Sequence, residues 1–470
     1  MNKKNNTNAQ LPLFIYAQSI IMSLDSEFNK YIYDKGFCCD RYDELLFSDI
    51  LMHDYLQPIK KLAEYYATVD NSYYVNLYKC YESHNFEAPL SILGYNYDLD
   101  EIVLQYAMCF KDIKMVIFFT YEDQINVITP EVNTILSNNN KNIHCYKKIQ
   151  LNNKQYYPLV YQLSWHNYEP VTYDYVKRKT SQLGLCSKYA TINILLCNNN
   201  DKSIKENLDS NGCECLCIDN RSYVLDLVKL FFNKNSIRLL QYQRIDRLLY
   251  GSYNSSLGLL MSYKNWLYQE IKPKDQIRFM IFSSGVLYTL GIRNMRDIDL
   301  IANWGKEEIP STITKYLVDT ATKFPFIDIH IRKNDKWYAN DKHQEYLSEW
   351  FDKEWPTLYS ATSMEDTILN PRHHYYYCGV KLISMKADIT RRIKRNRAAA
   401  FADLIALIMF TKIKVPIIEL DKGCWKEHIY YEYTDAEIKK MLKTVRYYMR
   451  KKYHIKMKEN EICKYIAIKK

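Results

Sequence analysis

The 470-residue chain has few of the features that mark fibrous, disordered or membrane-spanning proteins. It holds only 11 glycines and 12 prolines, while 47% of its residues are hydrophobic, a balance typical of folded globular proteins. No run of 18 apolar residues occurs, so we expect no contact with the interior of a membrane. The apolar segment 11–22 is interrupted by Gln18 and Ser19, which favours a buried helix over a secretory signal.

The 13 cysteines lack the regular spacing of a disulfide framework. Their odd number indicates free thiols and a reducing compartment such as the cytoplasm. The one cluster, Cys213, Cys215 and Cys217, lacks the wider ligand spacing of structural zinc sites. Since alternate residues of a strand share a face, the cluster predicts a core strand.

What the chain has in abundance is tyrosine, with 44 residues, together with Asn, Lys and Ile. This composition is typical of AT-rich genomes such as those of giant DNA viruses or protists. For a viral protein we expect the host cytoplasm or the virion as the location.

Length and residue pattern predict a multidomain protein of mixed α+β and α/β class. We expect four parts: a helical region 1–110, a small α/β domain 111–240, a domain 241–415 with a mixed sheet flanked by helices, and a basic helical region 416–470. In the second part we expect a buried strand at 114–121. The pattern that follows, a strand at 192–197, a helix near 202–209, a strand at 213–218 and a helix at 223–232, predicts a small α/β domain with a parallel sheet.

Elsewhere, apolar periodicity predicts helices at 49–66, 99–110, 257–271, 311–322, 403–412 and 435–452. It predicts strands at 297–302 and 325–331, and a helix or strand through 279–290.

The net charge of +10 is concentrated at the C-terminus. Residues 439–470 contain twelve Lys or Arg against two Glu, so the rest of the chain is about neutral. Tyrosines interleave with these cations, a combination that suits a phosphate backbone and stacked bases. The candidate nucleic-acid-binding residues are Arg446, Arg450, Lys451 and Lys452. A solvated helix with no ligand is the alternative.

Three carboxylates on two apolar segments carry the clearest chemical signal. Asp297 and Asp299 would share one face of a strand while Ile298 and Leu300 face the core. Asp328 lies 29 residues after Asp299 in a second apolar segment. Clustered carboxylates repel one another unless a cation separates them, and oxygen ligands suit Mg²⁺.

A turn is expected after an apolar segment, at Ser283, Ser284 and Gly285. The acidic pair begins at Asp297, 13 residues after Ser284. A small turn that opens a helix, an acidic pair and a later acidic residue together resemble the DNA polymerase β-like nucleotidyltransferase superfamily. The likeness covers about a third of the chain. Ser283 stands where the superfamily usually has glycine.

The resemblance implies that Asp297, Asp299 and Asp328 bind Mg²⁺ or Mn²⁺ and act in catalysis. It implies that Ser283, Ser284 and Gly285 contact a nucleoside triphosphate. Basic residues after the third aspartate, in a segment similar to the superfamily's phosphate-binding stretch, are further candidates for nucleotide binding: Lys381, Lys386, Arg391, Arg395 and Arg397. An ordinary basic helix face is the alternative.

These features predict a metal-dependent enzyme that transfers a nucleoside monophosphate, with AMP expected, from a triphosphate to a hydroxyl. The basic C-terminus favours an RNA 3′ end as acceptor, as in poly(A) polymerases. Two alternatives stay open: a glycosyltransferase that binds Mn²⁺ through Asp297 and Asp299, and a non-catalytic nucleic-acid-binding protein.

Overall fold

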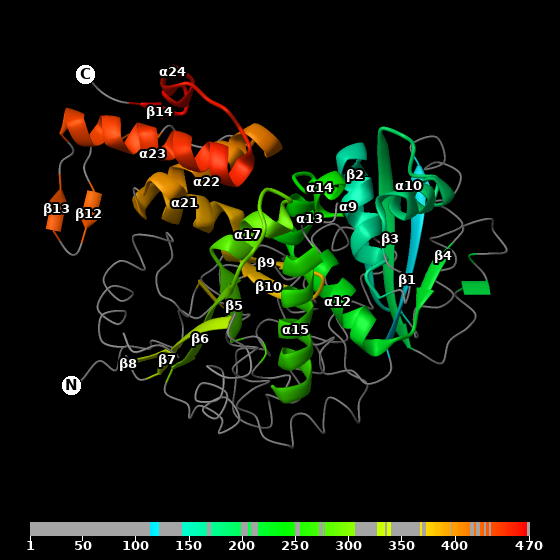
Figure 1. The fold of residues 1–470 in the computed structure, drawn as a ribbon. Helices are drawn as coiled ribbons and strands as arrows, with labels where there is room; N and C mark the ends of the chain where they lie inside the picture. Colours follow the sequence, from blue (N-terminus) through cyan, green and yellow to red (C-terminus); the bar gives the residue numbers. More distant parts are fainter. Residues whose placement is uncertain are drawn as a thin grey trace, which may run out of the picture. The chain divides into compact units, whose positions relative to one another are not determined.

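A computed structural model gives the arrangement of the chain (Figure 1). It describes residues 113–121, 143–166, 171–198, 215–249, 254–271, 278–305, 327–333, 336–339, 373–395, 397–413, 424–426, 429–431 and 434–467, with short pieces at 205–206, 208, 276, 367–368 and 418–419. The chain divides into two compact units, unit 1 (Met1–Ile237) and unit 2 (Arg238–Lys470). The helices predicted at 49–66, 99–110 and 311–322 lie outside the described residues, and the division into four parts stays a prediction.

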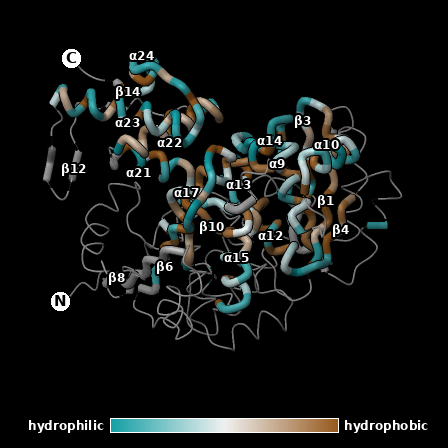
Figure 2. The backbone as a smooth tube through the Cα atoms, in the orientation of Figure 1, coloured by the Kyte–Doolittle hydropathy of each residue, from teal (hydrophilic) through white to brown (hydrophobic). Residues whose placement is uncertain are grey.

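Unit 1 is built on a four-stranded antiparallel sheet in the order β2-β3-β1-β4. The strands are β1 (Ile113–Tyr121), β2 (Ile143–Asn152), β3 (Tyr189–Asn198) and β4 (Cys215–Ile218). The strands predicted in β1 and β3 are confirmed. Met115 and Ile194 at their centres are fully buried, as expected for apolar runs covered on both faces. Figure 2 shows the hydrophobic character of β1.

The parallel sheet predicted for unit 1 is wrong. β3 and β4 run in the same direction, but β1 lies between them and pairs antiparallel with both. The alternation of strands and helices could not reveal this insertion, because β1 comes from an earlier part of the chain. The coarser prediction of a mixed α and β fold is confirmed.

The core strand predicted for the cysteine cluster is also wrong. β4 is an edge strand, in which Cys215 is half-buried and Cys217 is exposed, while Ile218 is buried. Period 2 gives which residues share a face, but not whether another element covers that face. Cys213 lies outside the described residues.

The helices of unit 1 are α9 (Asn153–Leu163), α10 (Tyr173–Gln182) and α12 (Arg221–Phe231), and α13 (Lys234–Leu240) crosses the boundary between the units. α9, α10 and α12 each begin at a side-chain cap, provided by Asn152, Thr172 and Asn220. These side chains accept hydrogen bonds from the N–H groups that a helix N-terminus leaves without partners. Polar residues therefore set the start of each helix.

Unit 2 contains a six-stranded mixed sheet in the order β8-β7-β6-β5-β10-β9. The strands are β5 (Phe279–Phe282), β6 (Ile298–Gly305), β7 (Ile327–Lys333), β8 (Lys336–Ala339), β9 (His374–Tyr377) and β10 (Val380–Ile383). β5 pairs parallel with β10 and antiparallel with β6, which in turn pairs parallel with β7. β9 and β10 form a hairpin whose turn residues, Cys378 and Gly379, both have positive φ.

The helices of unit 2 are α14 (Ile245–Leu248), α15 (Asn254–Glu270), α17 (Ser284–Thr289), α21 (Met385–Arg395), α22 (Ala398–Thr411), α23 (Asp435–Tyr453) and α24 (Glu459–Ile462). The predicted helices near 257–271, 403–412 and 435–452 correspond to α15, α22 and α23. Two small pairs complete the unit: β11 (Ile418–Glu419) with β14 (Ile466–Ala467), and β12 (Cys424–Lys426) with β13 (Ile429–Tyr431). None of the described helices has the length and apolarity needed to cross a bilayer.

The helix α23 begins at a capping box and packs against α22. Thr434 Oγ1 accepts from the Glu437 N–H, and the Glu437 carboxylate accepts from the Thr434 N–H. One face of the helix buries Leu442, Val445 and Met449, at helical spacing. Figure 2 shows the resulting alternation of hydrophobic and hydrophilic residues along α23.

Candidate active site

Strand pairing brings two of the predicted acidic residues together. Asp299 on β6 and Asp328 on β7 are Cα partners across a parallel pair of strands. Neighbouring strands lie about 4.8 Å apart, so the two backbones are adjacent at this point. On its other side Asp299 pairs with Phe282, the last residue of β5, and Asp297 immediately precedes β6. All three acidic residues therefore lie at one end of the sheet.

The alternation predicted around the acidic pair is confirmed. Ile298 and Leu300 are fully buried, whereas Asp297 is exposed and Asp299 is half-buried. The Asp328 side chain lies outside the described part of the structure. Among the described residues no group of three His, Cys, Asp or Glu could hold a metal ion. The metal site formed by all three aspartates stays a prediction.

The turn between β5 and α17 has a backbone conformation that favours glycine. Ser283 has φ 63° and ψ −116°, in a region that L-residues rarely adopt. Its side chain makes no capping hydrogen bond to α17. The next residue, Ser284, is buried, and its Oγ donates to the Asp297 carbonyl oxygen at 3.4 Å. This bond links the turn to the segment that carries the acidic pair.

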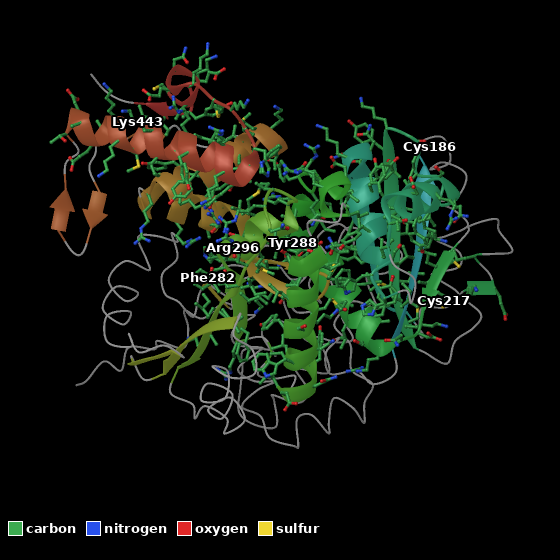
Figure 3. The ribbon with its side chains drawn as sticks, in the orientation of Figure 1. Cys186, Cys217, Phe282, Tyr288, Arg296 and Lys443 are labelled. Atoms are coloured by element: carbon green, nitrogen blue, oxygen red, sulfur yellow. The ribbon has the colours of Figure 1, made fainter. Side chains whose placement is uncertain are left out.

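Gly285 allows α17 to approach the sheet closely. A Cβ at this position would lie 2.6 Å from Ile281 Cγ2 and 3.3 Å from Leu382 Cδ2. At the other end of α17, Thr289 Oγ1 lies 2.7 Å from the Tyr375 hydroxyl of β9. The ring of Tyr288, labelled in Figure 3, packs edge-on against Tyr377. The short helix is thus held at both ends.

Contacts of its backbone fix the position of the loop between α17 and β6. Gly291 has φ +68°, and a Cβ there would lie 2.7 Å from the Arg244 carbonyl oxygen. The Met295 N–H donates to Ser256 Oγ at 2.8 Å, and that hydroxyl donates to the Met295 carbonyl oxygen at 2.9 Å. These contacts position the residues directly before Asp297.

A cluster of buried charges lies beside the turn. Within α21, Asp388 binds Arg391 at 2.8 Å and Arg392 at 2.6 Å. Arg392 also binds Asp403 of α22 at 2.5 Å, and Arg293 binds the same carboxylate at 3.2 Å. These distances and shared partners indicate one hydrogen-bonded network, as buried charges require.

The C-terminal helix completes this network. The Tyr453 hydroxyl donates to the Asp403 carboxylate, and Lys452 Nζ lies 3.8 Å from it. Burial alone would raise the pKa of Asp403, but the charges of Arg392, Arg293 and Lys452 hold it below its ordinary value. Burial together with the adjacent Asp403 charge raises the pKa of Tyr453 well above its usual range. Asp403 is therefore ionised and Tyr453 neutral at neutral pH.

Arg392 connects the network to the strained turn. Its Nη2 donates to the Ser283 carbonyl oxygen at 2.8 Å, while its other nitrogens bind Asp388 and Asp403. Burial alone would lower the pKa of Arg392, but the charges of the two carboxylates raise it. A permanently charged guanidinium thus holds the carbonyl of the residue with unfavourable φ.

The predicted phosphate-binding residues occupy different environments. Lys381 is buried, and its Nζ donates to the Ile368 carbonyl oxygen at 3.1 Å. Arg391 is buried against Asp388. Lys386 and Arg397 are exposed, and the side chain of Arg395 lies outside the described residues. No described contact groups Lys381, Lys386 and Arg397 with the turn, and their nucleotide role stays a prediction.

Of the residues predicted to bind nucleic acid, Arg446, Arg450 and Lys451 are exposed on α23. Lys452 is half-buried because it lies beside Asp403.

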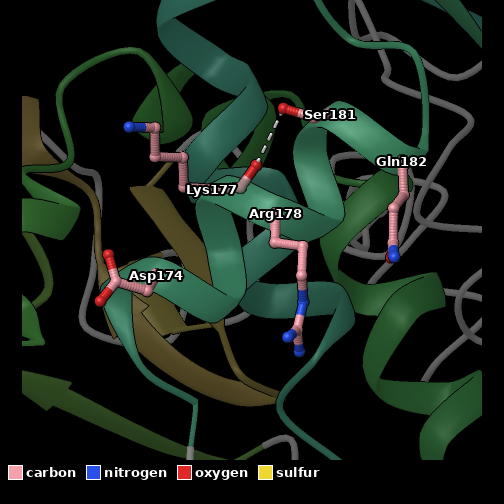
Figure 4. A pocket seen from close by; sticks show the side chains of 5 residues that line it. All are labelled: Asp174, Lys177, Arg178, Ser181 and Gln182. Atoms are coloured by element: carbon pink, nitrogen blue, oxygen red, sulfur yellow. Dashed lines mark hydrogen bonds between the residues drawn. The ribbon is translucent and has the colours of Figure 1, made fainter.

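In unit 1, a hollow on the exposed face of α10 is lined by Asp174, Lys177, Arg178, Ser181 and Gln182 (Figure 4). Ser181 Oγ donates to the Lys177 carbonyl oxygen at 3.3 Å, a bond within the helix itself. All five residues come from one helix, and we assign the hollow no part in the chemistry proposed below.

Sequence reasoning missed Arg392, Asp403 and Tyr453. The spacing of Asp388, Arg391 and Arg392 is that of ordinary ion pairs on a helix surface, so sequence gave no sign of their burial. One signal was present: Asp403 lies in the apolar run of α22, where an ionised carboxylate needs a partner.

No protein family, curated protein sequence or solved structure matches this chain.

Proposed function

We propose that unit 2 is a metal-dependent nucleotidyltransferase that transfers a nucleoside monophosphate, with AMP expected, from a triphosphate to an acceptor hydroxyl. One observation carries the proposal: Asp299 and Asp328 are register partners on adjacent strands, and Asp297 precedes β6 by one residue. The resemblance to DNA polymerase β-like nucleotidyltransferases supports it, because the turn, helix and acidic pair follow one another in the same order. The six-stranded sheet of unit 2 would then be of the nucleotidyltransferase type.

The donor chemistry at this end of the sheet suits Mg²⁺ or Mn²⁺. Carboxylate oxygens are the hard ligands that these cations prefer, and exposed Asp297 and half-buried Asp299 leave room for waters and phosphate oxygens. When bound, such cations would stabilise the entering and leaving oxygens of an in-line displacement, in which the acceptor oxygen bonds to the α-phosphorus and pyrophosphate leaves. Asp297, Asp299 and Asp328 would hold them.

The turn at Ser283, Ser284 and Gly285 would bind the triphosphate. Gly285 keeps this part of the backbone close to the sheet, and Ser284 ties it to the Asp297 segment. Arg392 holds the Ser283 carbonyl, so the turn is organised before any ligand arrives. Preorganisation of this kind lowers the entropic cost of ligand orientation.

The test uses the full chain with α-labelled nucleoside triphosphates, Mg²⁺ and an RNA oligonucleotide. We expect extension of the oligonucleotide, no extension with EDTA, and a loss of about 100-fold or more in Asp299→Asn and Asp328→Asn. Asp174→Asn, an exposed aspartate on α10, is the matched control and should behave as wild type. Absence of transfer with every nucleotide and acceptor, or full activity in both variants, would contradict the proposal.

The same variants distinguish the alternatives. A glycosyltransferase that uses only Asp297 and Asp299 would hydrolyse a nucleotide sugar or transfer its sugar, and the Asp328→Ala variant would keep this activity. A non-catalytic protein would show no activity in the wild type, so Asp297→Ala would have no effect. Parallel assays with labelled nucleotide sugars and nucleoside triphosphates separate the three cases.

A further inference from the structure

The exposed face of α23 carries a row of cations. Lys439, Lys443, Arg446 and Arg450, here named the cationic ridge, are spaced by four, three and four residues and so lie on one side of the helix. All four are exposed. From residue 438 to residue 458 the sequence contains no Asp or Glu. The ridge therefore presents positive charge along about 16 Å of helix, at a rise of about 1.5 Å per residue. Lys443 is labelled in Figure 3.

An aromatic ring lies beside the ridge. Tyr447 is 53% exposed, the one large hydrophobic side chain with such exposure among the described residues. Lys451 Nζ lies 5.3 Å from the centre of this ring and 2.8 Å from its hydroxyl, and the Tyr448 ring lies 5.6 Å away. An exposed ring among cations offers a stacking surface for a base next to contacts for phosphates.

The C-terminal end of α23 is bound to the candidate active site. Tyr453 and Lys452 contact Asp403, which also binds Arg392, the residue that holds the Ser283 carbonyl. Among the residues that the structure describes, this network has two buried cations, Arg391 and Arg392, two half-buried ones, Arg293 and Lys452, and two carboxylates, Asp388 and Asp403. Positive charge thus continues from the ridge to the turn.

Arg296 extends this charge to the acidic residues. It is exposed and immediately precedes Asp297; Figure 3 labels it together with Phe282, the β5 residue that pairs with Asp299. Burial lowers the pKa of Lys452, the charge of Asp403 opposes this shift, and the charges of Arg293, Arg392 and Arg296 add to it.

We propose that the cationic ridge binds the backbone of a single-stranded nucleic acid, that Tyr447 stacks on one of its bases, and that the strand runs toward Arg296 so that its terminal hydroxyl reaches Asp297. The last element rests on the proposed function, because it makes the strand the acceptor of the nucleotide. Phosphates complement a row of cations, and only unpaired bases are accessible to an exposed ring. A membrane surface fits less well, because the apolar face of α23 is buried in the protein.

The binding test measures fluorescence anisotropy of labelled 15-nucleotide RNA and DNA of the same sequence, with the full chain at several salt concentrations. Replacing Lys439, Lys443 and Arg446 together by Gln should weaken binding about tenfold or more. The slope of the logarithm of the binding constant against the logarithm of the salt concentration should become less steep by about 2, because each of the three lost phosphate contacts contributes about 0.7. The matched control replaces two exposed Lys and one exposed Arg of unit 1, Lys154, Lys177 and Arg178, by Gln. It should bind as wild type, and circular dichroism should show both variants folded.

A second variant tests the stacking contact. Tyr447→Ser should weaken binding about fivefold or more without changing the salt slope, whereas Tyr447→Phe should bind nearly as wild type. Duplexes should bind more weakly than single strands, and comparison of RNA with DNA shows which sugar is preferred. The proposal is overturned if the control triple loses as much binding as the ridge triple, or if the ridge triple loses none. It is also overturned if polyglutamate competes as well as unlabelled nucleic acid and Tyr447→Ser has no effect.

Transfer assays separate this inference from the proposed function. Replacement of the ridge residues should impair transfer to acceptors of about ten nucleotides, within the roughly 4–16 nucleotide range of single-strand sites, but not to a dinucleotide. If the wild type transfers nucleotides and the ridge triple variant does so equally well at every acceptor length, the proposed path of the acceptor strand is overturned. The proposed function then still stands. Binding with the expected variant effects but no transfer by wild type supports the ridge and overturns the proposed function and the acceptor role.

Discussion

At the scale of single residues, two glycines show how much the same substitution depends on its surroundings. Gly285→Ala should destabilise unit 2 by about 1–3 kcal/mol, because the added Cβ would lie 2.6 Å from Ile281 Cγ2. Gly258→Ala is the control: this glycine is exposed within α15 with nothing within 4 Å of an added Cβ, so alanine should stabilise by about 0.5–1 kcal/mol. Urea unfolding measures both, and equal effects would contradict the close packing of α17.

Ser283 gives a second prediction at this scale. Because its φ of 63° is unfavourable for any residue with a Cβ, Ser283→Gly should be more stable than Ser283→Ala by about 1 kcal/mol. Both variants remove the hydroxyl, but only alanine keeps the Cβ and therefore the backbone strain. Neither variant loses a capping hydrogen bond, because the Ser283 side chain makes none to α17. Urea unfolding of the two variants gives the difference. A more stable alanine variant would show that the turn relaxes to another conformation.

At the scale of elements, Asp403 joins three helices and the loop before β6. It lies in α22 and binds Arg392 of α21, Tyr453 of α23 and Arg293 of the loop. Asp403→Asn removes the negative charge shared by Arg392, Arg293 and Lys452 and leaves Arg392 with Asp388 alone, at a cost of about 3–5 kcal/mol. Urea unfolding at neutral pH measures this loss. Asp435→Asn is the control: Asp435 is exposed, so this change should alter the free energy of unfolding by less than about 0.5 kcal/mol.

The stability difference between wild type and Asp403→Asn should depend on pH with a defined sign. The pKa of Asp403 is lower in the folded state than its ordinary value, so its ionised form stabilises the protein above that ordinary value. This contribution should persist from about pH 5 to pH 8 and decrease as the pH falls below about 4, the range of an unperturbed aspartate. A difference that grew on acidification would show that Asp403 is protonated in the folded protein.

At the scale of the whole molecule, the chain forms two units, each with its own sheet. Met449 is fully buried in unit 2, where α23 packs on α22, so Met449→Ala should cost about 2–5 kcal/mol. We expect hydrogen exchange to quicken in α22, α23 and the sheet of unit 2, while β1 and β3 of unit 1 keep their protection. Mass spectrometry of peptides measures both regions, and Lys443→Ala on the exposed face is the control. Equal loss of protection in β1 and β3 would indicate that the two units unfold together.

The sequence by itself determined the local elements and the concentration of charge. Period 2 around Asp299 predicts which neighbours are buried, apolar periodicity predicts the helix at 435–452, and the cations of residues 439–470 follow directly from composition. These features depend on neighbouring residues, and local backbone geometry translates them into structure without information from distant segments.

Only the tertiary structure decided which distant segments became neighbours. The insertion of β1 between β3 and β4, the exposure of Cys217, and the register of Asp299 with Asp328 depend on strand pairing over long separations in the chain. The burial of Arg392 between Asp388 and Asp403 likewise requires two helices to pack beside the turn. Period and charge show what a residue can do on its own element. The partner that it meets depends on packing, because burial and long-range pairing are properties of the whole fold.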